Sequence, residues 1–396
     1  METQVLSDRI NNLTTSQTLA MAAKARELKE QGIDIISLSL GEPDFNTPDF
    51  IKEAAIQAIQ DNYSKYPPVE GYLELRQAIS NKFKRDNNLN YTANQIVVST
   101  GAKQALFNVA QAMINPGDEV IIPAPFWVSY AEIVKIAEGI PVEVSTTIDT
   151  DFKITAQQLE EAITPQTKMV WFSSPCNPSG SVYSKTELEA IAAVLEKHPA
   201  IYILSDEIYE HIIFDSAYCS IGSIGNLIER TITVNGISKA FAMTGYRIGY
   251  IGAPEFIAKA CAKMQGQVTS GANTIAQRAT ITAVNADPSV LKDMVSAFKN
   301  RRDIVVNLLR EIPGVKVNVP DGAFYLFPDV SAFFGKTLQG VTINNANDLS
   351  MYLLDKAYVA TVTGDAFGNP NCIRLSYATS EDQLTEALKR MKEALK

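Results

Sequence analysis

The sequence predicts an α/β protein with a mostly parallel sheet and a ligand site at the carboxyl ends of its strands. Runs of strand, turn and helix recur five times along the chain, and most of the strands are apolar enough to be buried. Strands that alternate with helices in this way are typical of a parallel sheet, whose ligands bind beyond the strand ends. Five chemically distinctive residues follow these strands directly: Gly101, Trp127, Asn177, Asp206 and Lys239.

Composition narrows the classes of function. A chain of 396 residues is long enough for about two or three domains and a deep site. The net charge of −9 and the dispersed Lys and Arg residues argue against a nucleic-acid partner. Two histidines and four separated cysteines without a CxxC pair give poor support to a metal site and suit a reducing compartment. The chemistry must therefore rest on lysine, carboxylates or a cofactor.

The N-terminus, METQVLSDRINN, has neither the basic nor the apolar segment of a secretory signal. No apolar run approaches the ~18 residues that a membrane span requires. We therefore expect a cytoplasmic protein without a membrane partner.

The first part of the chain predicts a helix, a strand and a glycine loop. A helix is expected over residues 19–32, with a glycine stop, and a short strand over 33–40. Gly41 follows, where the missing side chain allows a ligand to approach the backbone closely. The next helix is expected to have Pro48 at its first position. Tyr66 lies in a tyrosine-rich loop and on sequence alone is best interpreted as a packing residue.

A helix that begins directly after the strand at 96–100 predicts an anion site. Gly101, Ala102 and Lys103 open this helix, whose first N–H groups and positive dipole end would face the anion. Trp127 follows the next strand closely enough to stack on a planar ligand, and a core tryptophan is the alternative.

Two ionisable residues stand near strand ends in apolar surroundings. Asp206 follows the apolar strand at 200–204, and a carboxylate placed there requires a positively charged partner. Lys239 follows the strand at 231–234, and desolvation together with Arg247, the next charge, should lower its ammonium pKa. Such a lysine is a candidate Schiff-base former, and a surface lysine after a loop is the alternative.

The C-terminal part is expected to form a smaller second domain. A long helical region is predicted from Lys239 to about Leu309, followed by shorter elements. These are strands at 315–319, 323–327, 359–362 and 372–376, a helix near 347–356 and a final amphipathic helix. We divide the chain into an N-terminal arm with part of the small domain (1–46), a large cofactor-binding domain (47–300) and a small domain (301–396).

The sequence does not match either of two common nucleotide-binding motifs, the P-loop and GxGxxG, because the glycine spacing is wrong. Gly335-Lys336-Thr337 resembles the end of a P-loop, but Val330 stands where the first glycine is required. No GxGxxG follows the first strand either, which disfavours a nicotinamide-dependent dehydrogenase.

Pyridoxal phosphate would use all the distinctive residues, because it needs a lysine, a carboxylate for its pyridine nitrogen, an aromatic face and an anion cradle. The chain resembles the fold-type-I pyridoxal phosphate enzymes, in the class I and II aminotransferases of the aspartate aminotransferase family. The resemblance implies a large domain with a mostly parallel, seven-stranded sheet and a smaller α+β domain. It rests on motifs that span nearly the whole chain: Gly41–Phe45, Gly101–Asn108, Ser174-Pro175 with Asn177-Pro178, Ser205–Tyr209, Ser238-Lys239 through Tyr250, and Arg374–Tyr377.

The resemblance implies a role for each matching position around the cofactor. Lys239 would bind the cofactor aldehyde and transfer the proton of the reaction, and Asp206 would keep the pyridine nitrogen protonated. Tyr209 and Asn177 would donate hydrogen bonds to the phenolic oxygen, and Trp127 would stack on the ring. The phosphate would be bound by Gly101, Ala102 and Arg247, with Tyr66 contributed by the partner subunit of a homodimer that shares its active sites.

The resemblance also implies which residues bind the amino acid and 2-oxo acid substrates. Arg374 would bind the α-carboxylate as a bidentate fork, alongside Asn177, Trp127 and the backbone of Gly41. One branch of the family binds the second carboxylate with an arginine of the neighbouring subunit, but residues 267–277 hold no arginine here.

Lys103 and Thr18 match a different branch of the family, in which a lysine and a threonine take that second carboxylate. A solvated lysine is the alternative for Lys103, although a cation in a helix's first turn opposes the helix dipole. The chain departs from the family at Gly236, where some branches have a phosphate-binding serine, and at Cys176, where an asparagine is common.

The function expected from these residues is transamination between L-aspartate and 2-oxoglutarate, giving oxaloacetate and L-glutamate. Prephenate, aromatic or alanine-type substrates are the alternatives within the family. A non-catalytic ligand-binding domain of the same fold is the alternative from another class, and the lack of a basic DNA-binding region speaks against it.

Overall fold

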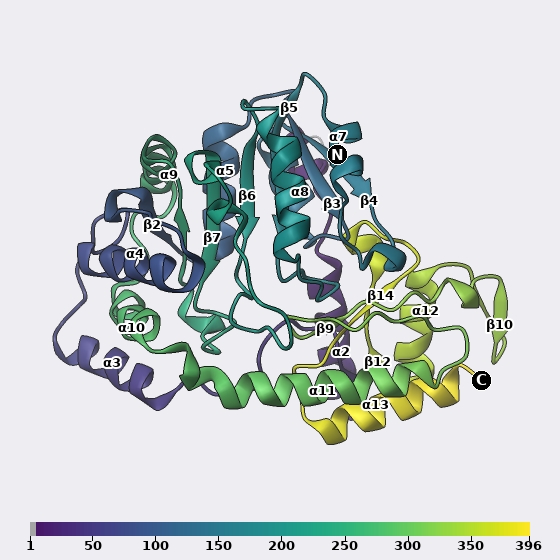
Figure 1. Cartoon of the computed structure of the whole chain (residues 1–396). Helices are drawn as coiled ribbons and strands as arrows, with labels where there is room; N and C mark the ends of the chain where they lie inside the picture. The colour runs from purple at the N-terminus through teal and green to yellow at the C-terminus, as the bar shows by residue number, and fades with distance from the viewer. Residues whose placement is uncertain (1–4) are drawn as a thin grey trace.

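A computed structural model describes residues 5–396, and a seven-stranded sheet lies at its centre (Figure 1). The strand order is β2-β8-β7-β6-β5-β3-β4, and every neighbouring pair is parallel except the two that involve β8. The strands are β2 (Ile96–Ser99), β3 (Glu119–Ala124), β4 (Ile140–Ser145), β5 (Thr167–Ser173), β6 (Tyr202–Asp206), β7 (Thr231–Gly236) and β8 (Gly249–Gly252). The predicted α/β class with a mostly parallel sheet is confirmed.

The prediction of an unbroken helical region after Lys239 was wrong, because the antiparallel strand β8 comes first. β8 has four residues, two of them glycine, and therefore lacks the apolar run that marks a buried strand. Gly252 lies where a Cβ would overlap the ring of Tyr91, so this strand needs glycine for its packing. Strand β4 was also missed, since it is an edge strand with mostly exposed or half-buried residues.

Helices cover both faces of the sheet, as Figure 1 shows. Alternating residues of β3 divide between the faces: Val120 and Ile122 pack with the helices α5, α6 and α9, whereas Ile121 packs with α7 and α8. The helices of this part are α3 (Asp49–Gln60), α4 (Leu73–Asn87), α5 (Ala102–Met113), α6 (Ser129–Ile136), α7 (Ala156–Ala162), α8 (Lys185–Glu196), α9 (Glu255–Val268) and α10 (Thr274–Asn285).

The remaining elements form a second, smaller group, built from the C-terminal part of the chain together with residues 17–37 near its start. Its strands build one antiparallel sheet of order β13-β14-β9, a hairpin and a parallel pair of β1 with β12. They are β1 (Ile36–Ser37), β9 (Tyr325–Leu326), β10 (Lys336–Leu338), β11 (Val341–Ile343), β12 (Val359–Ala360), β13 (Val362–Thr363) and β14 (Ile373–Ser376). The helices of this group are α2 (Gln17–Glu30), α11 (Lys292–Arg310), α12 (Ala346–Tyr352), continued by a π-helical turn at Leu353–Ala357, and α13 (Glu381–Ala394). The four-residue helix α1 (Asp8–Asn11) precedes them and buries none of its residues.

Several predicted boundaries were corrected by the structure. The strand expected over 33–40 has only two paired residues, and the segment 315–319 contributes a single bridge, Lys316 to Asp329. Pro48 is the residue before α3 rather than its first residue. Short strands depend on their partners more than on their own pattern, which explains these misses.

The three-part domain division stays a prediction, because α11 runs through residue 300 without a break. The parallel pairing of Ile36 with Val359 joins the N-terminal segment to the C-terminal group. Among residues 5–396, no helix combines the length and apolarity that crossing a membrane requires.

Candidate active site

A cavity of about 330 Å³ lies at the carboxyl ends of the parallel strands. Most residues predicted from the sequence line it together: Thr18, Gly41, Ala102, Lys103, Trp127, Asn177, Asp206, Tyr209, Lys239, Arg247 and Arg374. Two predicted residues do not. Gly101 lies behind the guanidinium of Arg247, and Tyr66 has a side chain that is 94% exposed.

Asp206 is the last residue of β6 and its carboxylate is buried. Its Oδ2 accepts a hydrogen bond of 2.7 Å from the Tyr130 hydroxyl, and its Oδ1 accepts one of 3.2 Å from the Ile208 N–H. Burial raises the pKa of the Asp206 carboxyl, while these hydrogen bonds and the charge of Lys239 oppose the rise. The cation expected beside Asp206 is thus replaced by a hydroxyl and an amide in the protein itself.

Lys239 follows β7 and points its ammonium at the carbonyl oxygen of Gly41, which accepts a hydrogen bond of 2.6 Å. Burial, followed by repulsion from Arg374, lowers the pKa of Lys239 to about 8. The predicted direction agrees with this shift, but Arg374 contributes more than Arg247, the cation expected from sequence. A lysine with this pKa has a usable neutral fraction near neutral pH.

The N-terminus of α5 forms the wall opposite these groups and carries free backbone donors, as every helix start does. Gly101 has φ +83°, and a Cβ on it would overlap the Arg247 guanidinium. The strand β8 also lies close to the N-terminus of α5, since a Cβ on Gly249 would overlap the backbone nitrogen of Ala102. A cation and a helix start are therefore held together, which is the chemistry of a phosphate site.

Ser238 lines this cavity, whereas Gly236 does not. Gly236 is buried inside β7, where a Cβ would lie 2.9 Å from the carbonyl oxygen of Ile248. A serine side chain at that position would have to displace the backbone of the neighbouring strand segment.

Arg374 lies in β14 and is buried, with only 2% of its surface exposed. Its Nη1 donates to Asn177 Oδ1 at 2.9 Å and its Nη2 donates to the Ser39 carbonyl at 2.6 Å. Its Nε has no hydrogen-bond partner among residues 5–396. Because Asn177 accepts through its oxygen, its amide nitrogen keeps its protons for another acceptor.

The cavity rim holds Lys103, whose ammonium lies 4.8 Å from the ring centroid of Trp127. Desolvation and the charge of Arg247 lower the pKa of Lys103. Thr18 of α2 reaches the cavity from the N-terminal segment, and its hydroxyl oxygen is buried without a partner in the described chain. Glu42 also lines the rim and accepts a hydrogen bond from Thr244.

Two lining tyrosines, Tyr130 and Tyr325, were missed by the sequence reasoning. Tyr130 lies only three residues after Trp127, and this closeness in sequence could have placed it near the ring site. Tyr325 lies in a two-residue strand, and its sequence context gives no sign that it reaches the cavity.

The charges that line the cavity form no ion pairs with one another or with any other residue in the 5–396 range. Four lining side chains are cationic and two are acidic: Lys103, Lys239, Arg247 and Arg374, against Glu42 and Asp206. None of the six has an opposite charge within 4 Å, although 24 ion pairs occur elsewhere in this range. Charges left unpaired around a cavity call for a ligand, here one with several anionic groups and one cationic group.

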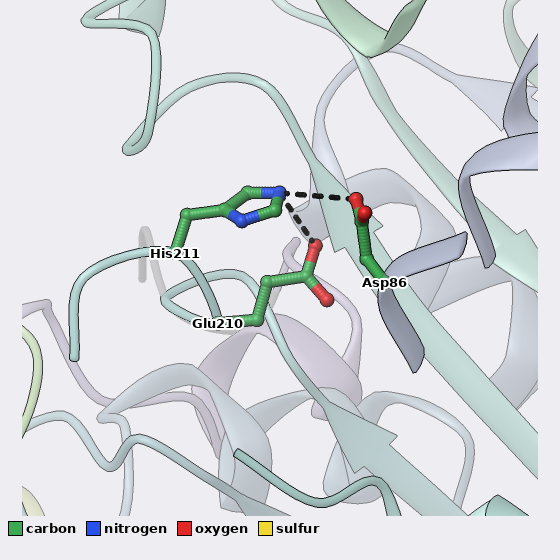
Figure 2. A group of neighbouring side chains, drawn as sticks. All are labelled: Asp86, Glu210 and His211. Atoms are coloured by element: carbon green, nitrogen blue, oxygen red, sulfur yellow. Dashed lines mark ion pairs between the residues drawn. The ribbon is translucent and has the colours of Figure 1, made fainter. Parts of the chain in front are cut away.

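A second group of titratable side chains, Asp86, Glu210 and His211, lies outside the cavity (Figure 2). His211 Nε2 is 3.6 Å from Asp86 and 3.3 Å from Glu210. The ammonium of Lys82 also contacts Glu210 and lies 3.9 Å from Asp86. A lysine already compensates these carboxylates, and we interpret the group as an internal ion network.

The profile of the family described as aminotransferase class I and II matches residues 33–391. The chain therefore belongs to the class I and II aminotransferases, as its resemblance predicted, and it is an aminotransferase.

Individual relatives narrow the comparison. One relative is the bifunctional aspartate aminotransferase and glutamate/aspartate-prephenate aminotransferase of Petunia hybrida. The two sequences are 47% identical over 395 residues, and the alignment covers 98% of this chain and 82% of that protein. The structure of the aspartate aminotransferase from Rhizobium meliloti matches with a TM-score of 0.95 at 44% identity over 98% of both chains. The structure of the aspartate aminotransferase from Thermus thermophilus with maleate matches with a TM-score of 0.93 at 42% identity, over 98% of this chain and 99% of that chain.

Pyridoxal phosphate is the cofactor of this family, and the cavity residues fit it. Asp206 offers a buried carboxylate without a cationic partner, which suits a protonated pyridine nitrogen. Arg247 and the start of α5 suit the phosphate, and Lys239 suits the aldehyde.

Proposed function

We propose that this aminotransferase transfers an amino group between L-aspartate and 2-oxoglutarate. The observation that carries the proposal is the set of unpaired charges around the cavity, with a formal excess of two positive charges. A phosphate and the carboxylates of a dicarboxylic substrate would neutralise the four cations, and a pyridinium would neutralise Asp206.

Lys239 is proposed as the group that moves the substrate proton. With a pKa of about 8, roughly a tenth of this amine is neutral at pH 7, enough to remove the α-proton and return it as an acid. When bound, pyridoxal phosphate supplies the electron sink that makes this proton acidic. Asp206 would stabilise the positive charge of the ring nitrogen, and the Tyr130 hydroxyl donates a hydrogen bond that holds this carboxylate in place.

Substrate orientation is assigned to the two ends of the cavity. Arg374 would bind the α-carboxylate, and the partners that fix two of its nitrogens, Asn177 and Ser39, leave it pre-organised. Lys103 and Thr18 would bind the second carboxylate at the rim. Within residues 5–396, Lys103 forms no ion pair and the Thr18 hydroxyl has no hydrogen-bond partner.

Prephenate is the second candidate substrate. The name of the Petunia hybrida relative includes prephenate transamination, and prephenate also carries two carboxylates. The same pair of cationic ends would therefore serve both substrates, and the ring of prephenate would have to fit between them.

We further propose a homodimer with shared sites. Tyr66 is an exposed aromatic residue that does not line the cavity of its own subunit, as expected of a side chain that contributes to the site of the partner subunit. Tyr66→Phe should impair the enzyme, and mixing these chains with inactive Lys239→Ala chains should restore activity, since one hybrid site would contain both native residues. Mixtures that stay inactive, although the Tyr66→Phe chain alone is impaired, would contradict the shared site.

A substrate panel tests the proposed specificity. Aspartate, glutamate, prephenate, phenylalanine and alanine should be compared by kcat/KM with the wild-type enzyme. The kcat/KM for aspartate and glutamate should be at least about tenfold higher than that for alanine and phenylalanine. A difference of this size is expected from roughly one extra charged hydrogen bond to the substrate. A preference for alanine or phenylalanine would overturn the proposal, and a dominant prephenate activity would replace it with the second candidate.

A further inference from the structure

We propose that Tyr325 is a positioning residue that donates a hydrogen bond to Tyr209 and thereby strengthens the bond that Tyr209 makes to the cofactor's phenolic oxygen. The inference deepens the proposed function and rests on it. Tyr325 is fully buried in β9 and lines the same cavity as Tyr209 and Arg374.

The two hydroxyl oxygens of Tyr325 and Tyr209 lie 2.7 Å apart, a normal distance for a hydrogen bond between hydroxyl groups. Each hydroxyl has one proton to donate. If Tyr209 gives its proton to the cofactor, Tyr325 must be the donor between the two. Among residues 5–396, the Tyr325 hydroxyl makes no other hydrogen bond that would compete for its proton.

Both tyrosines remain protonated over the working pH range, because burial raises the pKa of each hydroxyl above its usual value. The pair can therefore form a chain of two donors that ends at the cofactor. A carboxylate or a histidine in place of Tyr325 would change its charge with pH, whereas a tyrosine does not.

The Tyr325 side chain is fixed from three sides. Its ring centroid lies 4.7 Å from the Arg374 guanidinium and 4.8 Å from the ring of Phe324. Its hydroxyl is so near Gly41 that a Cβ on this glycine would overlap it. Tyr325 therefore touches the proposed donor to the cofactor, the proposed fork for the α-carboxylate and the loop that receives Lys239.

The consequence for the cofactor is a shift in its titration. A hydrogen bond to an anionic oxygen favours the unprotonated form, so the strength of Tyr209 donation sets the pH at which the bound cofactor's visible absorption changes. Donation from a second hydroxyl strengthens such a bond by about 10–30%. Removing the Tyr325 hydroxyl should then raise the apparent pKa of this absorption by about 0.2 to 0.6 unit.

The test is a spectroscopic pH titration of the holoenzyme with the Tyr325→Phe substitution. Phenylalanine keeps the ring beside Arg374 and removes only the hydroxyl. Tyr352→Phe is a matched control, because the Tyr352 hydroxyl is also buried and donates one bond of 2.7 Å, to the Ala394 carbonyl, outside the cavity. Tyr325→Phe should shift the titration upward, with the KM for aspartate changed less than about threefold, whereas Tyr352→Phe should leave the titration unchanged.

A double variant separates action through Tyr209 from an independent effect. In a Tyr209→Phe background, Tyr325→Phe should cause no further shift, since the bond it strengthens is gone. An unshifted titration in the single variant, or a full shift in the Tyr209→Phe background, would overturn the inference. If the wild type formed no visible band with pyridoxal phosphate, the proposed function itself would fail, which is a different outcome.

Discussion

Two clusters of charge follow the same strand, and they are organised in opposite ways. Asp206 ends β6 and faces the cavity, while Glu207 and Glu210 begin the next turn and face α4. The second cluster, which also contains Asp86 and His211, is called the α4 cluster below. In it Lys82 contacts Glu210, and Asn87 donates hydrogen bonds of 2.9 and 2.5 Å to Glu207 and Glu210.

The difference shows how to tell a structural charge from a functional one in this molecule. In the α4 cluster, the ammonium of Lys82 contacts Glu210 and lies 3.9 Å from Asp86, so these two carboxylates are compensated without a ligand. Glu207 instead accepts hydrogen bonds from Asn87, Ser205 and Ser220.

In the cavity cluster, the hydrogen-bond partners found within residues 5–396 are neutral: a hydroxyl for Asp206, a carbonyl for Lys239, and an amide oxygen and a carbonyl for Arg374. Both clusters are buried, and Glu207 also lacks an ion pair among the described residues, but its carboxylate oxygens are occupied by hydrogen bonds inside the protein. The unpaired charges of the other cluster line an open cavity, which makes that cavity the candidate ligand site.

The largest effect is expected for Lys239→Ala. Removing the proposed nucleophile and base should lower kcat by about 10⁴-fold or more, with the fold intact. Single-turnover kinetics and circular dichroism would measure the two properties. A variant that keeps more than about a tenth of wild-type kcat would refute the role of Lys239.

Asp206→Ala should lower kcat by about 10³-fold, since an unprotonated pyridine nitrogen withdraws electrons poorly. Glu207→Gln, one residue further along, is the matched control and should change kcat less than about fivefold. Equal losses in the two variants would mean that the cavity carboxylate acts only through the fold.

Substitutions in the α4 cluster should lower the free energy of unfolding and leave kcat nearly unchanged. Lys82→Met leaves the buried Glu210 without its cation and should lower the free energy of unfolding by about 3–5 kcal/mol. Urea unfolding would measure this loss, with kcat nearly unchanged in the folded fraction. The exposed pair of Lys389 and Glu386 provides the control, and Lys389→Met should cost no more than about 0.5 kcal/mol.

The sequence predicted the residues of the cavity better than the contacts between them. Asp206 and Lys239 could be placed at one edge of the sheet because they stand at or just after the carboxyl ends of the parallel strands β6 and β7. The partner of Asp206 was not predicted, because the contact joins Tyr130 of α6 to a residue 76 positions further along the sequence.

Two kinds of structure escaped prediction for physical reasons. The antiparallel strand β8 is held by backbone pairing with β2 and β7, and its glycines carry no apolar pattern. Tyr325 reaches the cavity only because β9 pairs with β14, a contact between segments about 50 residues apart that one sequence does not specify. The domain boundaries and the individual residue roles stay predictions.

Lys103→Ser should affect dicarboxylic substrates selectively. The loss of one charged hydrogen bond should lower kcat/KM for aspartate and 2-oxoglutarate by about 10- to 1,000-fold, with alanine little affected. Lys185→Ser is the matched control, because Lys185 also lies in the first turn of a helix but outside the cavity. An equal loss for alanine would point to a damaged phosphate site, and no loss for either substrate would exclude Lys103 as the selector.

The smallest effect concerns pH. The pKa of Lys239 is about 8, so below that pH the side chain is mostly an ammonium group, which has no free electron pair. The rate at which the cofactor-free enzyme binds pyridoxal phosphate should therefore increase about tenfold for each unit that the pH rises toward 8. The rate should level off above about pH 8, because the amine is then neutral. Stopped-flow absorbance would follow the capture, and a rise that continues toward the ordinary lysine pKa of about 10.4 would contradict the depressed value.

Trapping the cofactor with borohydride tests the distinction between the two clusters most directly. Reduction of the holoenzyme followed by peptide mapping identifies the lysine that carries pyridoxal phosphate. The unpaired Lys239 should be the labelled residue, and Lys82, buried and paired with Glu210, should carry no label. Label on Lys82, or on any lysine other than Lys239, would contradict the claim that the unpaired charges mark the active site.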